Sequence, residues 1–495
     1  MRTRSFRSGS RQGKSVGILS ALTAAIRRVA SGNSRQRPAP VKPQAPRKVL
    51  FESLEQRILL SGDPVTGGAL FVERSPGDPP AGGTPDAVLT STLTEDDDNV
   101  VIKQLSGNDT DGYLIQITVD GYDAVTYSGV GSIVINGLGG DDTFEFVDIT
   151  IDVTVDGGDG SDTLIGPDPT TTIPTNTWDV SDENAATLND TITFSAIENI
   201  VGGIGTDTLI GPDVNSTWNI GVYGQDENGD DIVVAATNAG TLNDTVSFSS
   251  MENLVGGSAI DEFAFGFGGG DGVAGTGASI TGLVDGGEGS NILDFSAYQT
   301  AVSIDLELGN STGGDFTGSI TDVVGGESIL DELTGVAADS AWNISSADGG
   351  EIRGVVVFSS FENLRGQANH SDTFVFEAEG SLQGSIDGGG GDGIDSLLFA
   401  KGAGLGYAAI SVAASGAGTM AGLGQTFGYS NIEPIVVTGT TTVAGDTVQI
   451  NGSAFNDEFV IESVAAASSA LQLRSTGADL YSDSGTLLSA IALAN

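Results

Sequence analysis

The sequence predicts an all-β protein, a parallel β-helix or β-solenoid repeat array whose coils turn on Gly-Asp segments. Glycine accounts for 74 of 495 residues and aromatic residues for only 6%, a composition typical of short strands separated by turns. The run GGDGSDTLI at 157–165 also returns as GGIGTDTLI at 202–210, as expected of a repeat. The varied repeat spacing leaves a string of tandem small β-sandwiches as the alternative.

Residues 1–49 form a basic leader, with 12 Lys or Arg and no acidic residue. Arg, Ser and Pro dominate this leader, so we expect it to be disordered. An apolar stretch at 16–30 follows the basic start, which makes an export signal the alternative. Arg27 and Arg28 stand where the small-residue cleavage site of such a signal would lie.

The segment 50–62 and its flank carry a family motif, reading FESLEQRILLSGDP at 51–64. It resembles the LEPR-XLL motif at the N-terminus of large surface or secreted repeat proteins of bacteria, with Gln56 where that family has Pro. The resemblance implies an exported protein that is extracellular or held at the bacterial cell surface. The matching residues are Leu54, Glu55, Arg57, Leu59, Leu60 and Ser61.

The repeat array is expected over residues 93–436, where short runs alternate apolar and polar side chains as half-buried strands do. Residues 63–92 are rich in Pro, Gly and Asp and are predicted to be a linker. The segment 135–146 aligns with 155–165 after twenty residues, which suits one coil of a solenoid. Residues 437–495 are expected to be a further diverged or incomplete repeat.

A longer unit is interleaved with the Gly-Asp turns and contains Trp, then Thr-Leu-Asn-Asp-Thr, then Phe-Ser-x-x-Glu-Asn. Every Trp of the chain occupies the same position in this unit, which predicts a core anchor; these are Trp178, Trp218 and Trp342. The Glu-Asn pairs predict a hydrogen-bonding ladder along the solenoid, because paired catalytic carboxylates would be gathered at one place. Their acidic members are Glu198, Glu252 and Glu362.

The turn carboxylates are the candidate metal ligands. The form G-G-x-G-x-D-x-U-x, with U a large apolar residue, resembles the calcium-binding nonapeptide of the repeats-in-toxin (RTX) secreted proteins. The resemblance implies Ca²⁺, which takes oxygen ligands from flexible turns. The candidates are Asp141, Asp142, Asp159, Asp162, Asp207, Asp285, Asp387, Asp392 and Asp395.

The alternative role for these residues is structural, with each Asp hydrogen-bonding its own turn. RTX turns hold Ca²⁺ between stacked neighbours, yet neither nonapeptide at 157–165 or 202–210 is followed directly by another. Asn291 also replaces Asp in a third turn. Both interpretations stay open at this point.

Charge and composition exclude several classes of partner. Beyond the leader, 7 basic residues face 66 acidic ones, a balance that repels nucleic acid and anionic membrane surfaces. The absence of Cys excludes disulfides and Cys-based zinc sites. No run of 18 apolar residues occurs, so no transmembrane helix is predicted.

No catalytic or cofactor-binding set is expected, because His370 is the only His and the sequence has no phosphate-binding loop. The enzymatic alternative is a lyase-like β-helix protein acting on acidic polysaccharide, with Arg353, Arg365 and Lys401 as candidate basic residues. An acidic polymer would be repelled by this negative body. The sequence therefore predicts a structural or adhesin-like exported protein, stabilised by Ca²⁺, whose other partners are cell-surface glycans or proteins.

Overall fold

The computed structural model describes a large part of the chain after the leader. The described residues are 71–74, 87–120, 122–167, 175–180, 186–225, 231–234, 237–266, 277–377, 379–399 and shorter stretches between 408 and 492. They belong to one of the two units into which the chain divides, Ser61–Asn495. The leader and the LEPR-XLL-like segment lie outside the described residues. The regular elements that are described are all strands. The described residues include no helix that is long and apolar enough to cross a membrane.

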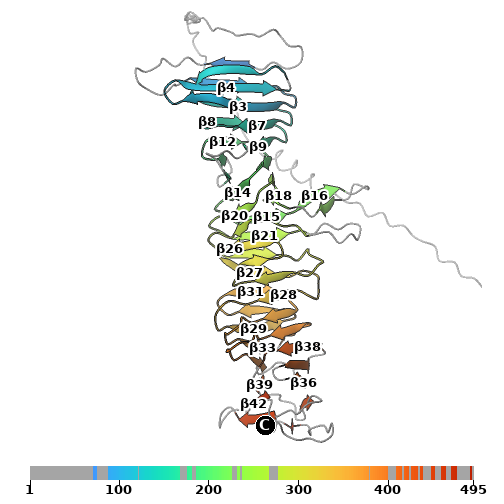
Figure 1. Ribbon diagram of the computed structural model, residues 1–495. Coiled ribbons are helices and arrows are strands. Elements are labelled where there is room, and N and C mark those ends of the chain that lie inside the picture. The colour runs from blue at the N-terminus through green and yellow to red at the C-terminus, as the bar shows by residue number, and fades with distance from the viewer. Residues whose placement is uncertain are drawn as a thin grey trace, which may run out of the picture. The chain divides into compact units, whose positions relative to one another are not determined.

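Two long sheets contain nearly all of these strands (Figure 1). Sheet A contains β1 (Phe71–Arg74), β2 (Val88–Thr92), β6 (Ser132–Asn136), β8 (Asp152–Asp156), β10 (Thr175–Asp179), β11 (Ala186–Leu188), β12 (Ile192–Ser195), β14 (Thr206–Ile210), β20 (Asn253–Val255), β22 (Leu283–Asp285), β24 (Ser303–Asp305), β25 (Asn310–Ser311), β26 (Gly314–Thr317), β28 (Glu332–Thr334), β32 (Asn363–Arg365), β34 (Ser385–Asp387), β36 (Ala408–Ala414), β37 (Ala417–Gly422), β38 (Gln425–Ser430), β40 (Thr447–Asn451) and β43 (Ile491–Ala492). Two of these strands, β1 and β2, fall within the segment predicted as a linker.

Sheet B alternates with sheet A along the chain. It contains β3 (Asn99–Asn108), β4 (Gly112–Val119), β5 (Val125–Val130), β7 (Thr143–Val147), β9 (Thr163–Ile165), β13 (Asn199–Val201), β15 (Ser216–Ile220), β18 (Ala239–Leu242), β19 (Val246–Ser249), β21 (Asp261–Phe265), β23 (Asn291–Asp294), β27 (Ile320–Val324), β29 (Ala341–Ser346), β30 (Gly349–Ile352), β31 (Val356–Ser359), β33 (Thr373–Phe376), β35 (Ser396–Phe399), β39 (Ile435–Thr438), β41 (Phe459–Ser463) and β42 (Ala470–Ser475). A separate hairpin joins β16 (Val222–Gln225) to β17 (Asp231–Val234).

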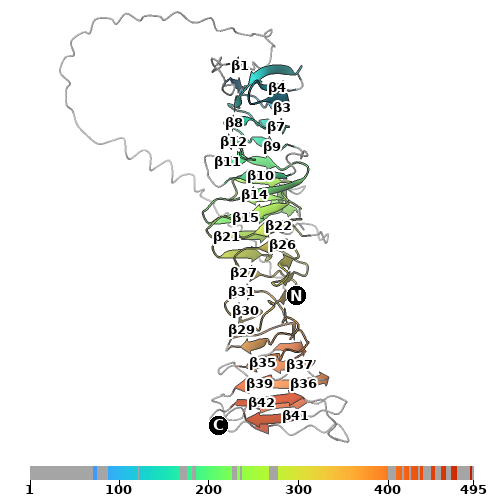
Figure 2. The ribbon, with the colours of Figure 1, turned by 60° about the vertical axis from the view of Figure 1, so that its left-hand side comes forward.

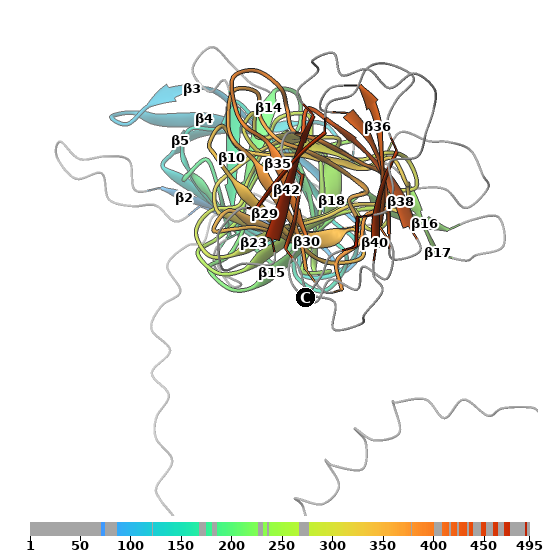
Figure 3. The same ribbon diagram turned by 90° about the horizontal axis from the view of Figure 1, so that it is seen from below.

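Successive coils stack through parallel pairing, which confirms the predicted all-β solenoid. Ser132 of β6 pairs with Asp152 of β8, and Thr143 of β7 pairs with Thr163 of β9. Both offsets are the twenty residues that the sequence predicts for one coil. The coils follow one another along the stack in chain order (Figures 1 and 2), and the view along the stack shows the coils overlying one another (Figure 3).

Three-stranded antiparallel meanders interrupt this parallel stack, a feature that the repeat pattern in the sequence does not predict. In sheet A, β10–β11–β12 lies between β8 and β14. In sheet B, β15–β18–β19 lies between β13 and β21. The next meanders are β24–β25–β26, β29–β30–β31 and β36–β37–β38, again in alternate sheets. The longer Trp-bearing unit is therefore not a plain coil, because it includes one antiparallel meander.

The Asn-Asp pairs of this unit make the tight turn between the second and third strands of a meander. The pairs at 189–190 and 243–244 have φ of 53° to 55°, and Asn and Asp tolerate this left-handed region better than other side chains. The Asn side-chain oxygen then accepts a hydrogen bond from the N–H of Thr177 in the first copy and of Thr217 in the second, both at 2.9 Å. One residue pair thus closes the hairpin and fixes the start of the meander.

The three Trp side chains are core anchors, as predicted. All are fully buried on the first strand of their meanders. Trp218 stacks on Phe263 of the next coil with ring centroids 5.5 Å apart, and Trp342 stacks on Phe374 at 5.2 Å. Such aromatic pairs add stability beyond the area that they bury.

A glycine makes room for each indole ring. A Cβ atom added to Gly166, Gly211 or Gly335 would lie 2.9, 2.5 or 2.8 Å from the Cζ2 atom of the Trp that follows it. These distances are too short for a side chain. The recurrence of the Gly-Pro-Asp triplet at 166–168 and 211–213 is therefore explained in part by core packing.

Candidate functional site

The repeated polar residues gather at the two edges of the stack, where the chain passes between sheets. We call the passage from a sheet A strand to a sheet B strand the first edge, and the return passage the second edge. The turn before β7 and the turn before β9 lie at the first edge, whereas the turn before β14 lies at the second. The turns before β7 and β9 stack directly, because Gly139 pairs with Asp159.

A column of acidic side chains, three buried and the last half-buried, runs along the first edge, one from each of four successive coils. Its members are Asp98, Asp142, Asp162 and Glu198. The N–H of Asp98 donates to Oδ1 of Asp142 (2.8 Å), that of Asp142 to Oδ1 of Asp162 (2.8 Å), and that of Asp162 to Oε2 of Glu198 (2.9 Å). We call such a run an acid column; in each bond the donor belongs to the earlier coil and the acceptor to the later one.

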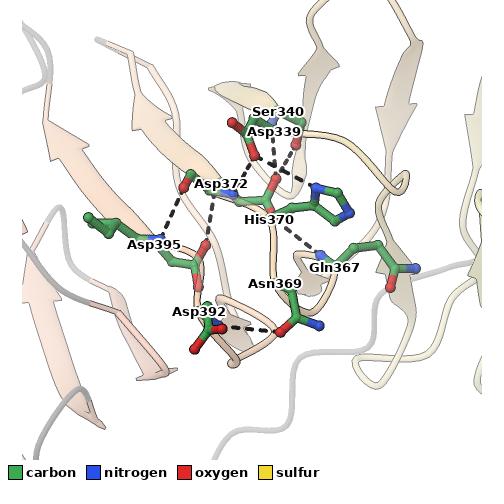
Figure 4. A network of polar contacts seen from close by, with 10 residues as sticks. Asp339, Ser340, Gln367, Asn369, His370, Asp372, Asp392 and Asp395 are labelled. Atoms are coloured by element: carbon green, nitrogen blue, oxygen red, sulfur yellow. Dashed lines mark hydrogen bonds and ion pairs between the residues drawn. The ribbon is translucent and has the colours of Figure 1, made fainter.

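Further acid columns continue the pattern on alternate edges. The N–H groups of Asn176 and Asp207 donate to Asp207 (3.1 Å) and Glu252 (2.8 Å) at the second edge. Back at the first edge, the N–H of Asp261 donates to Asn291 Oδ1 (2.9 Å). Later columns contain Asp331, Asp372 and Asp395, where the N–H of Asp372 donates to Asp395 Oδ1 at 2.9 Å (Figure 4). The first two columns end at a Glu that follows a meander.

The spacing of the Gly-Asp motif follows from these buried carboxyl groups. A Cβ atom on Gly137 would lie 2.5 Å from Oδ2 of Asp142, and one on Gly157 would lie 2.6 Å from Oδ2 of Asp162. The first Gly of each turn therefore leaves the space that the Asp five residues later fills. The side chain of that Asp points into its own turn.

Burial raises the pKa of the column Asp side chains, since desolvation disfavours the charged form. Desolvation, with added repulsion from Asp162 and Asp98, raises the pKa of Asp142 to about 7. The pKa of Asp395 rises to about 6 for the same first cause. The pKa is raised, mainly by burial, in Asp98, Asp162, Asp207, Asp261, Asp331 and Asp372. Oδ2 of Asp142, Asp162 and Asp207 has no hydrogen-bond partner.

The candidate metal ligands of the first turns divide into buried and exposed groups. Asp142 and Asp162 are fully buried in one column, and Asp207 is fully buried at the other edge. Asp141 is exposed, and its Oδ1 accepts a hydrogen bond from the N–H of Ser161 in the next coil at 2.9 Å. Asp159 is exposed on the same stacked pair of turns.

The remaining candidates occupy diverged turns and also hydrogen-bond to the backbone. Oδ1 of Asp285 accepts the N–H of Gly287 (3.0 Å), and Oδ1 of Asp387 accepts that of Gly389 (3.1 Å). The backbone N–H of the exposed Asp392 donates to Asn369 at 3.4 Å (Figure 4). The bonds of Asp285 and Asp387, each to the residue two positions later, are those of Asx turns, whereas the bond of Asp392 links two coils.

The described part of the chain contains no group of three or more acidic or His side chains that could hold a metal ion. A Ca²⁺ site draws on about six to eight oxygen ligands, and the column carboxyl groups already accept backbone hydrogen bonds. The geometry fits the structural role of the turn Asp residues better than an enclosed calcium site. Calcium binding stays a prediction.

The Asn side chains after the repeated Glu residues link neighbouring coils, which confirms the predicted ladder. Nδ2 of Asn199 donates to the carbonyl oxygen of Asp162 (3.2 Å), and Nδ2 of Asn363 donates to that of Asp331 (3.2 Å). Asn253 accepts the N–H of Leu283 from the following coil at 3.0 Å. These amides extend hydrogen bonding between coils beyond the sheets.

The basic residues of the enzymatic alternative do not converge in the described part of the chain. Nε of Arg365 lies 3.9 Å from Asp387, and both side chains are partly exposed. Arg353 is exposed on another turn, and Lys401 lies outside the described residues. His370 lies 3.7 Å from the exposed Asp339 (Figure 4).

Replacing Asp142 by Asn is expected to stabilise the protein at pH 8 by about 1 to 3 kcal/mol. Asn291 shows that an amide fits this position, because its Oδ1 keeps the column bond while its Nδ2 donates to Gly286. At pH 8 the substitution removes a buried charge. The gain should vanish near pH 4, where Asp142 is protonated in the folded state. Urea denaturation followed by circular dichroism at both pH values measures it.

The reverse change, Asn291→Asp, is the matched control and should destabilise the protein at pH 8. A loss of stability in Asp142→Asn that appears only with Ca²⁺ present would contradict the structural role and support a metal ligand.

The chain matches no protein-family model and no curated protein. The resemblances to LEPR-XLL and RTX proteins therefore rest on the quoted residues alone.

Proposed function

We propose that this chain is a structural, adhesin-like repeat module of an exported protein, secreted or held at a bacterial cell surface. The observation that supports the proposal is the use of the repeated polar residues. Asp142, Asp162 and Glu198 each accept a hydrogen bond from the preceding coil. These side chains hydrogen-bond neighbouring coils to one another and do not converge around a ligand. Such coupling along the array supports a role as a stalk.

Export is the part of the proposal that a cell experiment tests. Protease added to intact cells that produce the protein is expected to digest it, because the array would stand outside the membrane. A cytoplasmic marker protein in the same cells is the control and should survive. Digestion of the array only after lysis would contradict surface exposure.

Calcium is proposed to stabilise the array, whose 66 acidic residues oppose only 7 basic ones beyond the leader. A site with Kd of about 10⁻⁴ M would contribute roughly 1.4 kcal/mol at 1 mM Ca²⁺. Thermal unfolding followed by circular dichroism should therefore shift upward with added CaCl₂. Solutions of NaCl at matched ionic strength control for screening. Equal melting in both salts would refute calcium stabilisation and leave the structural proposal standing.

A further inference from the structure

Two of the sheet B meanders, β15–β18–β19 and β29–β30–β31, differ at one turn position. In β15–β18–β19 that position is Asn238, and in β29–β30–β31 it is Asp348. The two residues have the same backbone conformation, with φ of 59° and 50°. The N–H of Asn238 donates to the carbonyl oxygen of Ser279 (2.8 Å), and that of Asp348 donates to Ser381 (2.9 Å). The positions are therefore structurally equivalent.

In the first of these meanders the amide satisfies a column-ending Glu. Nδ2 of Asn238 donates to Oε1 of Glu252 at 2.9 Å. Oε2 of Glu252 accepts the N–H of Asp207 at 2.8 Å. Both oxygens of this carboxylate have a donor, so it is satisfied as an anion.

In the second meander a carboxyl group replaces the donor. The oxygens of Asp348 accept the N–H (2.8 Å) and Nε2 (2.7 Å) groups of Gln383. An ionised Asp348 has no hydrogen to give to Glu362, the residue equivalent to Glu252. Glu362 is 7% exposed, and its Oε2 has no hydrogen-bond partner.

The charged groups that face Glu362 are both acidic. Asp348 faces it from the turn between β29 and β30, and Asp331 faces it from the preceding coil. On the side of the following coil, Ser385 donates its N–H to the backbone oxygen of Glu362 and carries no charge. Burial, reinforced by these two carboxylates, raises the pKa of Glu362 to about 7.

We propose that Asp348 and Glu362 form a proton-dependent joint between the β29–β30–β31 meander and the coils beside it. A proton on Glu362 replaces the amide hydrogen that Asn238 supplies in the preceding sheet B meander. Loss of that proton places two buried carboxylates together, and the meander then opens more readily. The joint depends only on the pH around the protein and not on the export that we propose above.

The direction of the pH effect follows from proton linkage. When the meander opens, Glu362 regains its ordinary pKa of 4.5, while in the closed state the pKa is about 7. The closed state binds the extra proton, so the proton stabilises the closed state fully below pH 4.5. This stabilisation is lost as the pH rises from 4.5 to 7, and the stability of the closed state does not change further above pH 7. The opening constant should rise roughly tenfold per pH unit within this window.

Hydrogen–deuterium exchange of the full chain between pH 5 and 8.5, corrected for intrinsic exchange, tests the joint. In the wild type, residues 349–359 should lose protection up to pH 7 and then level off. Asp348→Asn, which restores the arrangement of Asn238, should flatten this dependence. The reciprocal Asn238→Asp should introduce it at 239–249. Both variants are compared with the wild type, which accounts for titration elsewhere in the array.

Unchanged pH dependence in Asp348→Asn would overturn the proposal. Glu362→Gln, which keeps the side-chain size and removes the titration, should also be flat, and a retained slope there would overturn it equally. If 1 mM CaCl₂ restores protection of residues 349–359 at pH 8, a cation and not a proton fills the gap, and the joint as proposed is wrong.

Discussion

Truncation of Trp218 to Ala is expected to lower the free energy of unfolding by about 3 to 5 kcal/mol. The indole is fully buried, stacks on Phe263 and meets Phe248 edge-on with centroids 6.3 Å apart. Its Nε1 also donates to Oδ1 of the buried Asp261 at 3.2 Å. The substitution therefore leaves a cavity and removes a hydrogen bond from a buried carboxyl group. Urea denaturation followed by circular dichroism measures the loss.

Two controls separate packing from general sensitivity to substitution. Trp218→Phe keeps an aromatic ring and should cost less than Trp218→Ala. Val357→Ala changes a half-exposed side chain of β31 and should stay within about 0.5 kcal/mol of the wild type. Equal losses in Trp218→Ala and Val357→Ala would show that the Trp is not a core anchor.

Substitution of Gly157 by Ala is expected to destabilise the protein by about 2 to 4 kcal/mol. The new methyl group would clash with the carbonyl oxygen of Ala196 and would lie 2.6 Å from Oδ2 of Asp162. One obstacle is backbone of a neighbouring coil, so the turn itself must shift. The shift would also disturb the column bond between Asp142 and Asp162. Chemical denaturation near neutral pH measures the effect.

Gly139→Ala is the matched control, because Gly139 pairs with Asp159 in the next turn, where a side chain is already present. The nearest atom to its added Cβ is Oε2 of Glu95 at 3.2 Å, the end of a flexible side chain. This variant should be close to the wild type. If both glycine variants behave alike, the steric account of the motif is wrong.

The fold class could be predicted because it depends on local signals. Alternating short runs and the twenty-residue offset between 135–146 and 155–165 define a coil, and the structure has that coil. The repeat pattern does not reveal the meanders, because it shows which residues recur and not how the chain turns between them. The Asn-Asp pairs at 189–190 and 243–244 were the available signal, since a turn with two positive φ angles favours these residues.

The candidate site could be predicted only in part. The motif identified Asp142 and Asp162, but the same spacing allows the carboxyl group to point outward to a metal ion or inward to the turn. The inward direction depends on partners 44 and 20 residues away, which a local pattern does not contain. The motif does not identify Asp331 and Asp372, because each follows its Gly by six positions instead of five, as Asp372 follows Gly366.

The acid columns give the array a chemical polarity. A coil lost from the C-terminal end of a column removes an acceptor and leaves a backbone N–H, such as that of Asp142, which water can satisfy at the newly exposed end. A coil lost from the N-terminal end removes the donor, and the carboxyl group that accepted its hydrogen bond, such as that of Asp142, must then be satisfied by water or by a proton. During synthesis from the N-terminus, each new coil brings a carboxyl group to a coil that already presents the backbone N–H that donates to it.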